Sequence, residues 1–379
     1  MKRSNLLGSL GLFVSLFGLV LLAHQSHAQS PDVQKRKHES AQKGMIYVTK
    51  EEILAGAKRE GKVLVYPGHD EKTIPLLVNA FKQKYPFLKE VNFGFVSDIA
   101  PGQRELFDMI AGKAARDAFN LHGTFWSQYF KHDLLKKYDF KAMAQDRQLE
   151  IPLGMIDESG VVVWLATNIG VMLYNTKHVP PDSAPTGWES CIDPKWKGKF
   201  YLDTKPNEIV WLLPSWGEDA VIEYAKKLKA NEPIFGSSRS GGITRLASGE
   251  FHLQCTVYYH TTQRALKNDP TMPVKIVIPN PLPIALLEPD AIYARAENPH
   301  AGLLWLEFLA SREAQQIADS REPGRASFLV EGTLANKLAR GANVSICGSS
   351  CRNQQERLAG RIATEAWGLP SVGANPKRK

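Results

Sequence analysis

Residues 161–202 read VVVWLATNIGVMLYNTKHVPPDSAPTGWESCIDPKWKGKFYL, and the rest of the chain is organised around them. The segment opens with an apolar, β-branched run, which predicts a buried strand that continues through Ile169–Tyr174. Asn175 and the Pro180–Pro181 pair end this strand, because proline cannot donate a hydrogen bond to a sheet and favours a turn. A turn-rich segment with two tryptophans follows and leads into a second predicted strand at Phe200–Leu202.

The length and composition predict a globular chain with more than one domain. The chain has 379 residues, of which 43% are hydrophobic and 23% charged, so it can bury a sizeable core. Residues 1–28 place two basic residues before an apolar stretch, Leu6–Ala23, and end in the small-residue pattern Ser26-His27-Ala28. We predict a cleavable secretory signal peptide, with an uncleaved membrane anchor as the alternative.

An exported protein enters an oxidising compartment, where cysteines pair. The chain has four, which allow two disulfides in three pairings: Cys191, Cys255, Cys347 and Cys351. We favour a Cys347–Cys351 pair, because the short, flexible Gly-Ser-Ser between them can close on itself. The formal net charge of +8 is compatible with anionic solutes, but no basic-aromatic array is present, so we expect no nucleic-acid partner.

The first half of the chain alternates predicted strands with amphipathic helices. Residues 29–44 are polar and aperiodic and predict a disordered leader, after which Thr49 and Glu52 form a capping-box pattern. Strands are predicted at Lys62–Tyr66, Val91–Val96 and Asp117–Leu121, and helices at Glu51–Gly61, Ile74–Tyr85, Gln103–Gly112 and Phe125–Tyr138. Such βαβ units predict a parallel sheet, and ligands of open α/β sheets bind beyond the carboxyl ends of the strands.

Several motifs resemble the extracellular solute-binding proteins of ABC importers, in the branch of the periplasmic ferric-ion binders. They are Tyr174-Asn-x-x-x-Val179, Asp193-Pro-Lys-Trp-Lys-Gly-Lys199, Leu246-Ala-Ser-Gly-Glu250, and the late segments that begin at Asp290 and Asn298. Val274–Pro279 resembles the strand that crosses back to the first lobe. The resemblance covers roughly residues 50–335.

This resemblance implies an α/β, two-lobed periplasmic-binding-protein fold of type II. Each lobe would be a mixed, mostly parallel sheet flanked by helices, and crossing hinge strands would join the lobes. Lobe 1 is expected to be discontinuous, at 45–160 and 283–335, and 161–282 to hold the hinge strands and lobe 2. Residues 336–379 form a C-terminal extension that the resemblance does not reach.

The resemblance also implies a function. A monomeric periplasmic receptor would capture a ligand between the lobes and deliver it to the permease and ATPase subunits of an ABC importer. Ferric ion is the favoured cargo, and no resident cofactor is expected. The alternatives are a small organic anion or phosphonate, or a cationic amine or thiamine-like solute, which would need cleft carboxylates such as Asp70, Glu71 and Glu158. A sensor subunit would use the same fold, whereas a secreted hydrolase is disfavoured because the chain has no G-x-S-x-G or H-E-x-x-H motif.

The resemblance points to metal ligands at predicted strand ends. Ferric binders carry two adjacent tyrosines near the position of Tyr258 and Tyr259, and a hard trivalent cation favours anionic oxygen. His122 follows the third strand, where the family has a carboxylate ligand, and His69 follows the first, where it has a histidine. Packing aromatics and hydrogen-bonded structural histidines are the alternative interpretations.

The remaining candidates suit other ligand groups. Asp70 lies beside His69 and could replace it in the site. Thr204 and Asn207 precede a predicted helix, whose N-terminal amides could hold an anion or could simply be capped. Arg239, in the loop Ser237–Ser240, could clamp an anion through two hydrogen bonds, or could be an exposed, solvated side chain.

Overall fold

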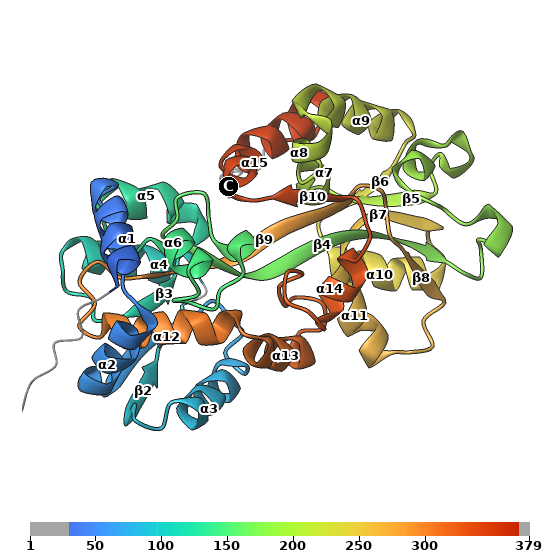
Figure 1. Cartoon of the computed structure of the whole chain (residues 1–379). Helices are drawn as coiled ribbons and strands as arrows, with labels where there is room; N and C mark the ends of the chain where they lie inside the picture. Colours follow the sequence, from blue (N-terminus) through green and yellow to red (C-terminus); the bar gives the residue numbers. More distant parts are fainter. Residues whose placement is uncertain (1–29, 97, 371–379) are drawn as a thin grey trace, which may run out of the picture.

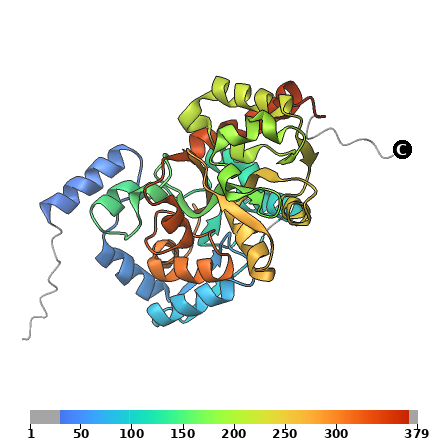
Figure 2. The same ribbon diagram turned by 90° about the vertical axis from the view of Figure 1, so that its right-hand side faces the viewer.

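The computed structural model describes residues 30–96 and 98–370 and has two lobes joined by long strands (Figure 1). The predicted signal peptide lies outside these residues. Figure 2 shows the same two lobes after a rotation of 90°. No helix among the described residues is long and apolar enough to cross a membrane.

Two antiparallel strands, β4 (Val163–Asn175) and β9 (Leu282–Ile292), run through both lobes and form the hinge. Every residue of β4 is buried, which explains why its sequence is a near-continuous apolar run. The strands belong to a single sheet with the order β2-β1-β3-β9-β4-β7-β5-β6. The predicted two-lobed α/β fold with crossing hinge strands is therefore what the chain adopts.

Lobe 1 contains the parallel strands β1 (Lys62–Tyr66), β2 (Glu90–Phe93) and β3 (Ala118–Asn120). The predicted capping box starts α2, since the Thr49 side chain accepts from the Glu52 amide and the Glu52 carboxylate accepts from the Thr49 amide. The other helices of this lobe are α3 (Ile74–Lys84), α4 (Ile99–Ile110), α5 (Trp126–Lys131), α6 (Phe140–Gln145), α12 (Pro299–Ala310) and α13 (Arg312–Arg321), with α2 at Lys50–Glu60.

Lobe 2 is built on β5 (Phe200–Asp203), β6 (Ile234–Gly236), β7 (Leu253–Tyr258) and β8 (Val274–Val277). Its helices are α7 (Asn207–Val210), α8 (Leu213–Trp216), α9 (Glu218–Ala230), α10 (Arg239–Ser248) and α11 (Tyr259–Asn268). Cys191 and Cys255 form a disulfide in the core of this lobe. The second disulfide is the predicted Cys347–Cys351 pair.

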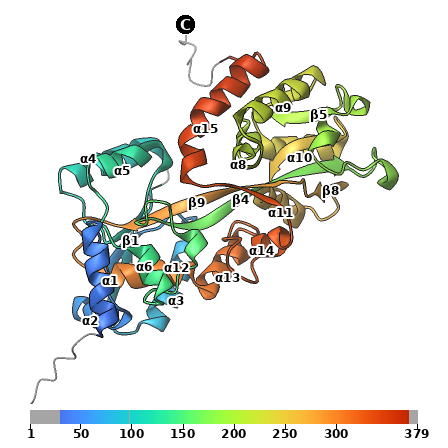
Figure 3. The ribbon, with the colours of Figure 1, turned by 45° about the horizontal axis from the view of Figure 1, so that its top comes forward.

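The described part of the C-terminal extension, up to residue 370, packs on lobe 2. After α14 (Leu334–Ala339), strand β10 (Val344–Cys347) pairs in parallel with the hinge strand β9. Helix α15 (Ser349–Arg361) then lies beside α8 and α9, as Figures 1 and 3 show. A π-helical turn, Ile362–Ala366, ends the element.

Three expectations from the sequence are wrong in detail. Pro31–Gln42, in the predicted disordered leader, forms helix α1, which is held by an ion pair of 3.0 Å between Arg36 and Asp146 and by other polar contacts. The return crossing is made by β9, whereas β8, within the segment predicted to cross, is a short strand that pairs with β4. The predicted helix at Phe125–Tyr138 is also shorter, since α5 ends at Lys131.

Candidate functional site

Tyr258 ends strand β7 and presents its phenol between polar and aromatic neighbours. Its hydroxyl accepts a hydrogen bond of 3.0 Å from the side-chain amide of Asn207. Its ring stacks on Trp211 with centroids 5.4 Å apart, and the Arg239 guanidinium lies 4.3 Å from its centroid on another side. Burial, with Glu208 adding to it, raises the pKa of the phenol to about 12. The hydroxyl is therefore neutral unless a bound cation displaces its proton.

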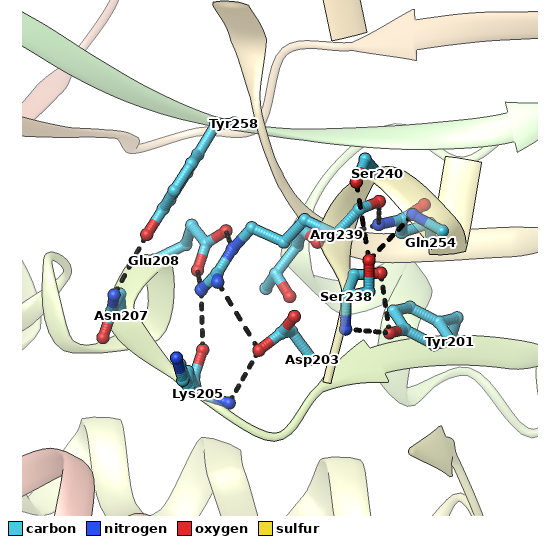
Figure 4. A network of polar contacts seen from close by, with 12 residues as sticks. Tyr201, Asp203, Lys205, Asn207, Glu208, Ser238, Arg239, Ser240, Gln254 and Tyr258 are labelled. Carbon is cyan, nitrogen blue, oxygen red and sulfur yellow. Dashed lines mark hydrogen bonds and ion pairs between the residues drawn. The ribbon is translucent and has the colours of Figure 1, made fainter. Parts of the chain in front are cut away.

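Arg239 is held by carboxylates of its own lobe (Figure 4). It donates to both oxygens of Glu208, at 2.8 and 2.9 Å, and to the carbonyl of Lys205 at 2.8 Å, and it lies 3.5 Å from Asp203. Burial disfavours the charged guanidinium, but Glu208 more than compensates and raises the pKa of Arg239. An incoming anion would have to compete with two carboxylates for this side chain. The sequence analysis considered an anion clamp and an exposed, solvated side chain for Arg239, and it predicted neither carboxylate partner.

Tyr259 lies apart from Tyr258, because neighbouring residues at a strand end point to different sides. It opens α11 and is 8% exposed, packed in the apolar cluster of lobe 2. A Cβ atom on Gly324 would lie 2.4 Å from its ring, so the loop after α13 covers it. The structure does not bring the two predicted tyrosine ligands together.

The hinge strand β9 carries a partly buried ion pair that the sequence analysis did not find. Glu288 pairs with Arg325, and its backbone has φ 49°, a left-handed conformation that is strained for a residue with a side chain. Gly68 approaches so closely that a Cβ there would lie 1.9 Å from a Glu288 carboxylate oxygen. The acidic residues Glu288 and Asp290, which follow the apolar run Leu282–Leu287, were the signal available in the sequence.

His69 and Asp70 follow β1, as predicted, but they differ in burial. His69 is 6% exposed, its Nδ1 has no hydrogen-bond partner among the described residues, and burial, assisted by Arg325, lowers its pKa to about 4. Asp70 is exposed and accepts from the Lys72 amide at 2.9 Å. It shares a pocket of about 380 Å³ with His260 of lobe 2, whose pKa burial lowers to about 3.

His122 lines a second pocket, of about 490 Å³. Its Nδ1 accepts from the Thr124 amide at 3.3 Å, and its ring lies 5.2 Å from that of Phe125. The opposite wall of the pocket comes from the C-terminal extension, which includes Arg352 and Asn353. His122 therefore faces residues that lie beyond the predicted lobes.

Thr204 and Asn207 flank the loop between β5 and α7. The Thr204 amide donates to the carbonyl of Gly236 at 2.8 Å and so continues the pairing of β5 with β6. Asn207 is the first residue of α7, which has four residues, and it binds Tyr258. Asn207 thus donates a hydrogen bond to the phenol oxygen through its side chain. This contact was not part of the helix N-terminal role expected from the sequence.

Electrostatic coupling links these groups across the two lobes. Burial and, after it, the positive charge of Arg325 lower the pKa of His69 in lobe 1 and of His260 in lobe 2. Burial lowers the pKa of Arg352 of the extension, and the charge of Glu288 on the hinge opposes this shift. The candidate site is therefore the interlobe region around Tyr258, Glu288 and Arg325.

The described residues contain no group of three or more His, Cys, Asp or Glu side chains placed to hold a metal ion. Phenol and amide oxygens lie outside that set, and Tyr258 supplies one such oxygen at the lobe boundary. A phenol oxygen is a donor that suits a hard cation better than a soft one.

The family model of the bacterial extracellular solute-binding proteins matches residues 119–348, more than half of the chain. The chain belongs to this family. The match takes in both hinge strands and all of lobe 2 up to the start of the extension helix. Among curated protein sequences, none matches this solute-binding protein at a significant level.

Solved structures with the same fold include three iron-binding proteins. Trichodesmium IdiA (FutA), in complex with iron and citrate, has a TM-score of 0.63 at 16% identity and covers 82% of this chain and 100% of its own. A Bordetella ferric binding protein has a TM-score of 0.65 at 15% identity, covering 80% and 98%. Iron-bound HitA from Pseudomonas aeruginosa has a TM-score of 0.56 at 14% identity, covering 79% and 99%. These likenesses establish the two-lobed fold of this solute-binding protein.

Proposed function

We propose that this solute-binding protein is the periplasmic receptor of an ABC importer and that its lobes close on a ferric ion. Its family consists of extracellular solute-binding proteins, and several proteins of the same fold are described as ferric-ion binders. A ligand held by both lobes stabilises the closed form, because it binds that form more tightly than the open one. A permease would then receive the cargo from the closed receptor.

The observation that carries the iron proposal is the environment of the Tyr258 phenol. Burial opposes the phenolate in the empty site, but Asn207 donates to its oxygen and Arg239 lies over its ring, and both favour the anionic form. A trivalent cation supplies the remaining stabilisation and takes the place of the proton. The phenol is thus expected to stay protonated in the empty site and to lose its proton when a cation binds.

The test is to purify the protein from periplasm without chelators and to record its native mass and visible absorption spectrum. We expect a mass increase of one iron and a visible phenolate-to-iron charge-transfer band. A colourless protein that carries a small organic mass, or that only organic anions or amines stabilise against heat, would replace ferric ion by one of those solutes. Pull-down of permease and ATPase subunits by the loaded protein tests the transport role against a sensor role.

A further inference from the structure

Helix α15 begins directly after the region that the family model matches, and it packs on lobe 2. Leu358 of the helix and Ile362 and Trp367, which follow it, are buried in the core of that lobe, and the Trp367 indole donates to the carbonyl of Ala225 at 3.0 Å. Two arginines of the helix also pair with Glu218 of α9. Helix α15 and the turn after it thus form a wall of lobe 2.

This wall closes the 490 Å³ pocket against lobe 1. Its lining includes Ser349, Arg352 and Glu356 from the extension, His122 and Trp126 from the region of η1 (Gly123–Phe125) and α5, and Trp164 and Pro289 from the hinge strands. The volume is in the range of small-molecule sites. A ligand there would contact both lobes.

Arg352 is the cation of this pocket, and it has no carboxylate partner among the described residues. Its Nη1 donates to the carbonyl of Leu286 at 2.9 Å, and its guanidinium lies 5.4 Å from the centroid of the Trp164 ring. Burial lowers the pKa of Arg352, but an arginine remains charged at any physiological pH. Glu288 offsets part of the cost of burying this charge but forms no ion pair with it, and a bound anion would lower the cost further.

Other donors surround the same space. Hydroxyl groups of Thr124 and Ser127 line the pocket, and Ser349 opens α15, a helix of 13 residues whose N-terminus has no side-chain cap. Such a terminus offers free amides and the positive end of the helix dipole. The Ser349 hydroxyl itself is bound to Asp157, so the amides, not this hydroxyl, would face a ligand.

The opposing charge in the pocket is Glu356, one helical turn after Arg352. Residues four apart on a helix can pair, yet these two side chains form no ion pair in the structure. Glu356 would repel an anion or, in a zwitterionic ligand, would bind its ammonium group. Removing the charge of Glu356 should therefore help an anionic ligand to bind and weaken the binding of a zwitterionic one.

We propose that the pocket between lobe 1 and α15 binds a small organic carboxylate, with Arg352 as the group that binds its charge. The ring of Trp126, stacked on Trp164 at 5.4 Å, offers an apolar surface for the body of such a ligand. Arg352 lies beyond the family match, whereas residues of the facing wall such as His122 and Trp126 lie within it. The proposal does not depend on a ferric cargo. A carboxylate bound there would bridge the lobes and favour the closed form.

The experiment is isothermal titration of the iron-free protein with malonate, benzoate and benzamide. Benzamide has the shape of benzoate but no charge. We expect benzoate or malonate to bind, and benzamide to bind at least tenfold more weakly than benzoate, the loss that one charge-assisted contact implies. Equal binding of benzoate and benzamide, or no heat from either carboxylate at millimolar concentrations, would overturn the proposal. This comparison needs no variant and so does not depend on mutant folding.

Variants locate the site. Arg352→Gln should weaken carboxylate binding at least tenfold, whereas Arg357→Gln, on the exposed side of the same helix, should not change it. Glu356→Gln should leave carboxylate binding unchanged or strengthen it, and a loss in that variant would contradict a simple anion site. Arg352→Gln should keep any iron-dependent colour, and Tyr258→Phe should keep carboxylate binding, so that the two proposals can fail separately.

Discussion

Tyr258 and Tyr259 are adjacent in the chain, yet Tyr258 stacks on Trp211 at the lobe boundary while Tyr259 packs beneath Gly324. The phenol of Tyr258 therefore lies at the lobe boundary, whereas that of Tyr259 is part of an apolar core. The difference arises because β7 ends at Tyr258 and α11 begins at Tyr259, so that the backbone turns between them. We therefore expect any iron ligation to involve the Tyr258 phenol and not the Tyr259 phenol.

Tyr258→Phe should abolish the visible band of the iron-loaded protein, and Tyr259→Phe should retain it. The phenol of Tyr258 is protonated before binding, so iron should also release about one proton from it, which titration in buffers of different ionisation enthalpy measures. Loss of the band in the Tyr259 variant alone would contradict this assignment. Both variants keep the ring and so preserve the packing.

Arg239→Gln should lower the free energy of unfolding by about 3–5 kcal/mol, because it leaves the buried Glu208 carboxylate without its partner. The double variant with Glu208→Gln should recover part of this loss, since no buried charge is then unpaired. Denaturant unfolding measures both. The control is Arg245→Gln, whose pair with Glu250 is exposed and should contribute less than about 1 kcal/mol.

Stability should fall with acid because two buried histidines are neutral in the folded protein. Their pKa values are lowered from 6.5 to about 4 for His69 and to about 3 for His260, chiefly by burial. The unfolded chain therefore binds protons first, and the free energy of unfolding should fall by about 1.4 kcal/mol per histidine for each pH unit below 6.5, until the folded pKa is reached.

Denaturant unfolding at several values of pH tests this slope. His69→Asn should reduce the slope of unfolding free energy against pH by the contribution of one histidine. His132→Asn, at an exposed position, should leave it unchanged. A slope that is the same in the His69 variant as in the parent would mean that His69 does not remain neutral in the folded protein.

The disulfides should differ in their contribution to stability, because they close loops of different length. Cys191 and Cys255 are 64 residues apart, and Cys347 and Cys351 are 4 apart. Replacing both cysteines of a pair by alanine should cost about 4 kcal/mol for the first and about 2 kcal/mol for the second, on a loop-entropy basis. Thermal unfolding of the two double variants compares them, and a larger loss from the second pair would contradict this ranking.

Local sequence patterns determined the elements of this protein. The Thr49–Glu52 capping box, the apolar run of β4 and the short Cys347–Cys351 spacing are each complete within a few residues, so the sequence predicts their structures. The same holds for the order of strands and helices in both lobes. Helix α1 was missed because contacts with distant residues such as Asp146 stabilise it, and not an apolar face of its own.

Only the tertiary structure decided which polar groups meet. Glu288 and Arg325 are 37 residues apart, and Arg239 is 31 residues from Glu208, so no local sequence pattern predicts either pair. Arg352 lies in an extension that the family motifs do not reach, yet the pairing of β10 with β9 carries it to the lobe boundary. Sequence patterns reflect interactions between near neighbours, whereas a ligand site is assembled from side chains that the sheet brings together.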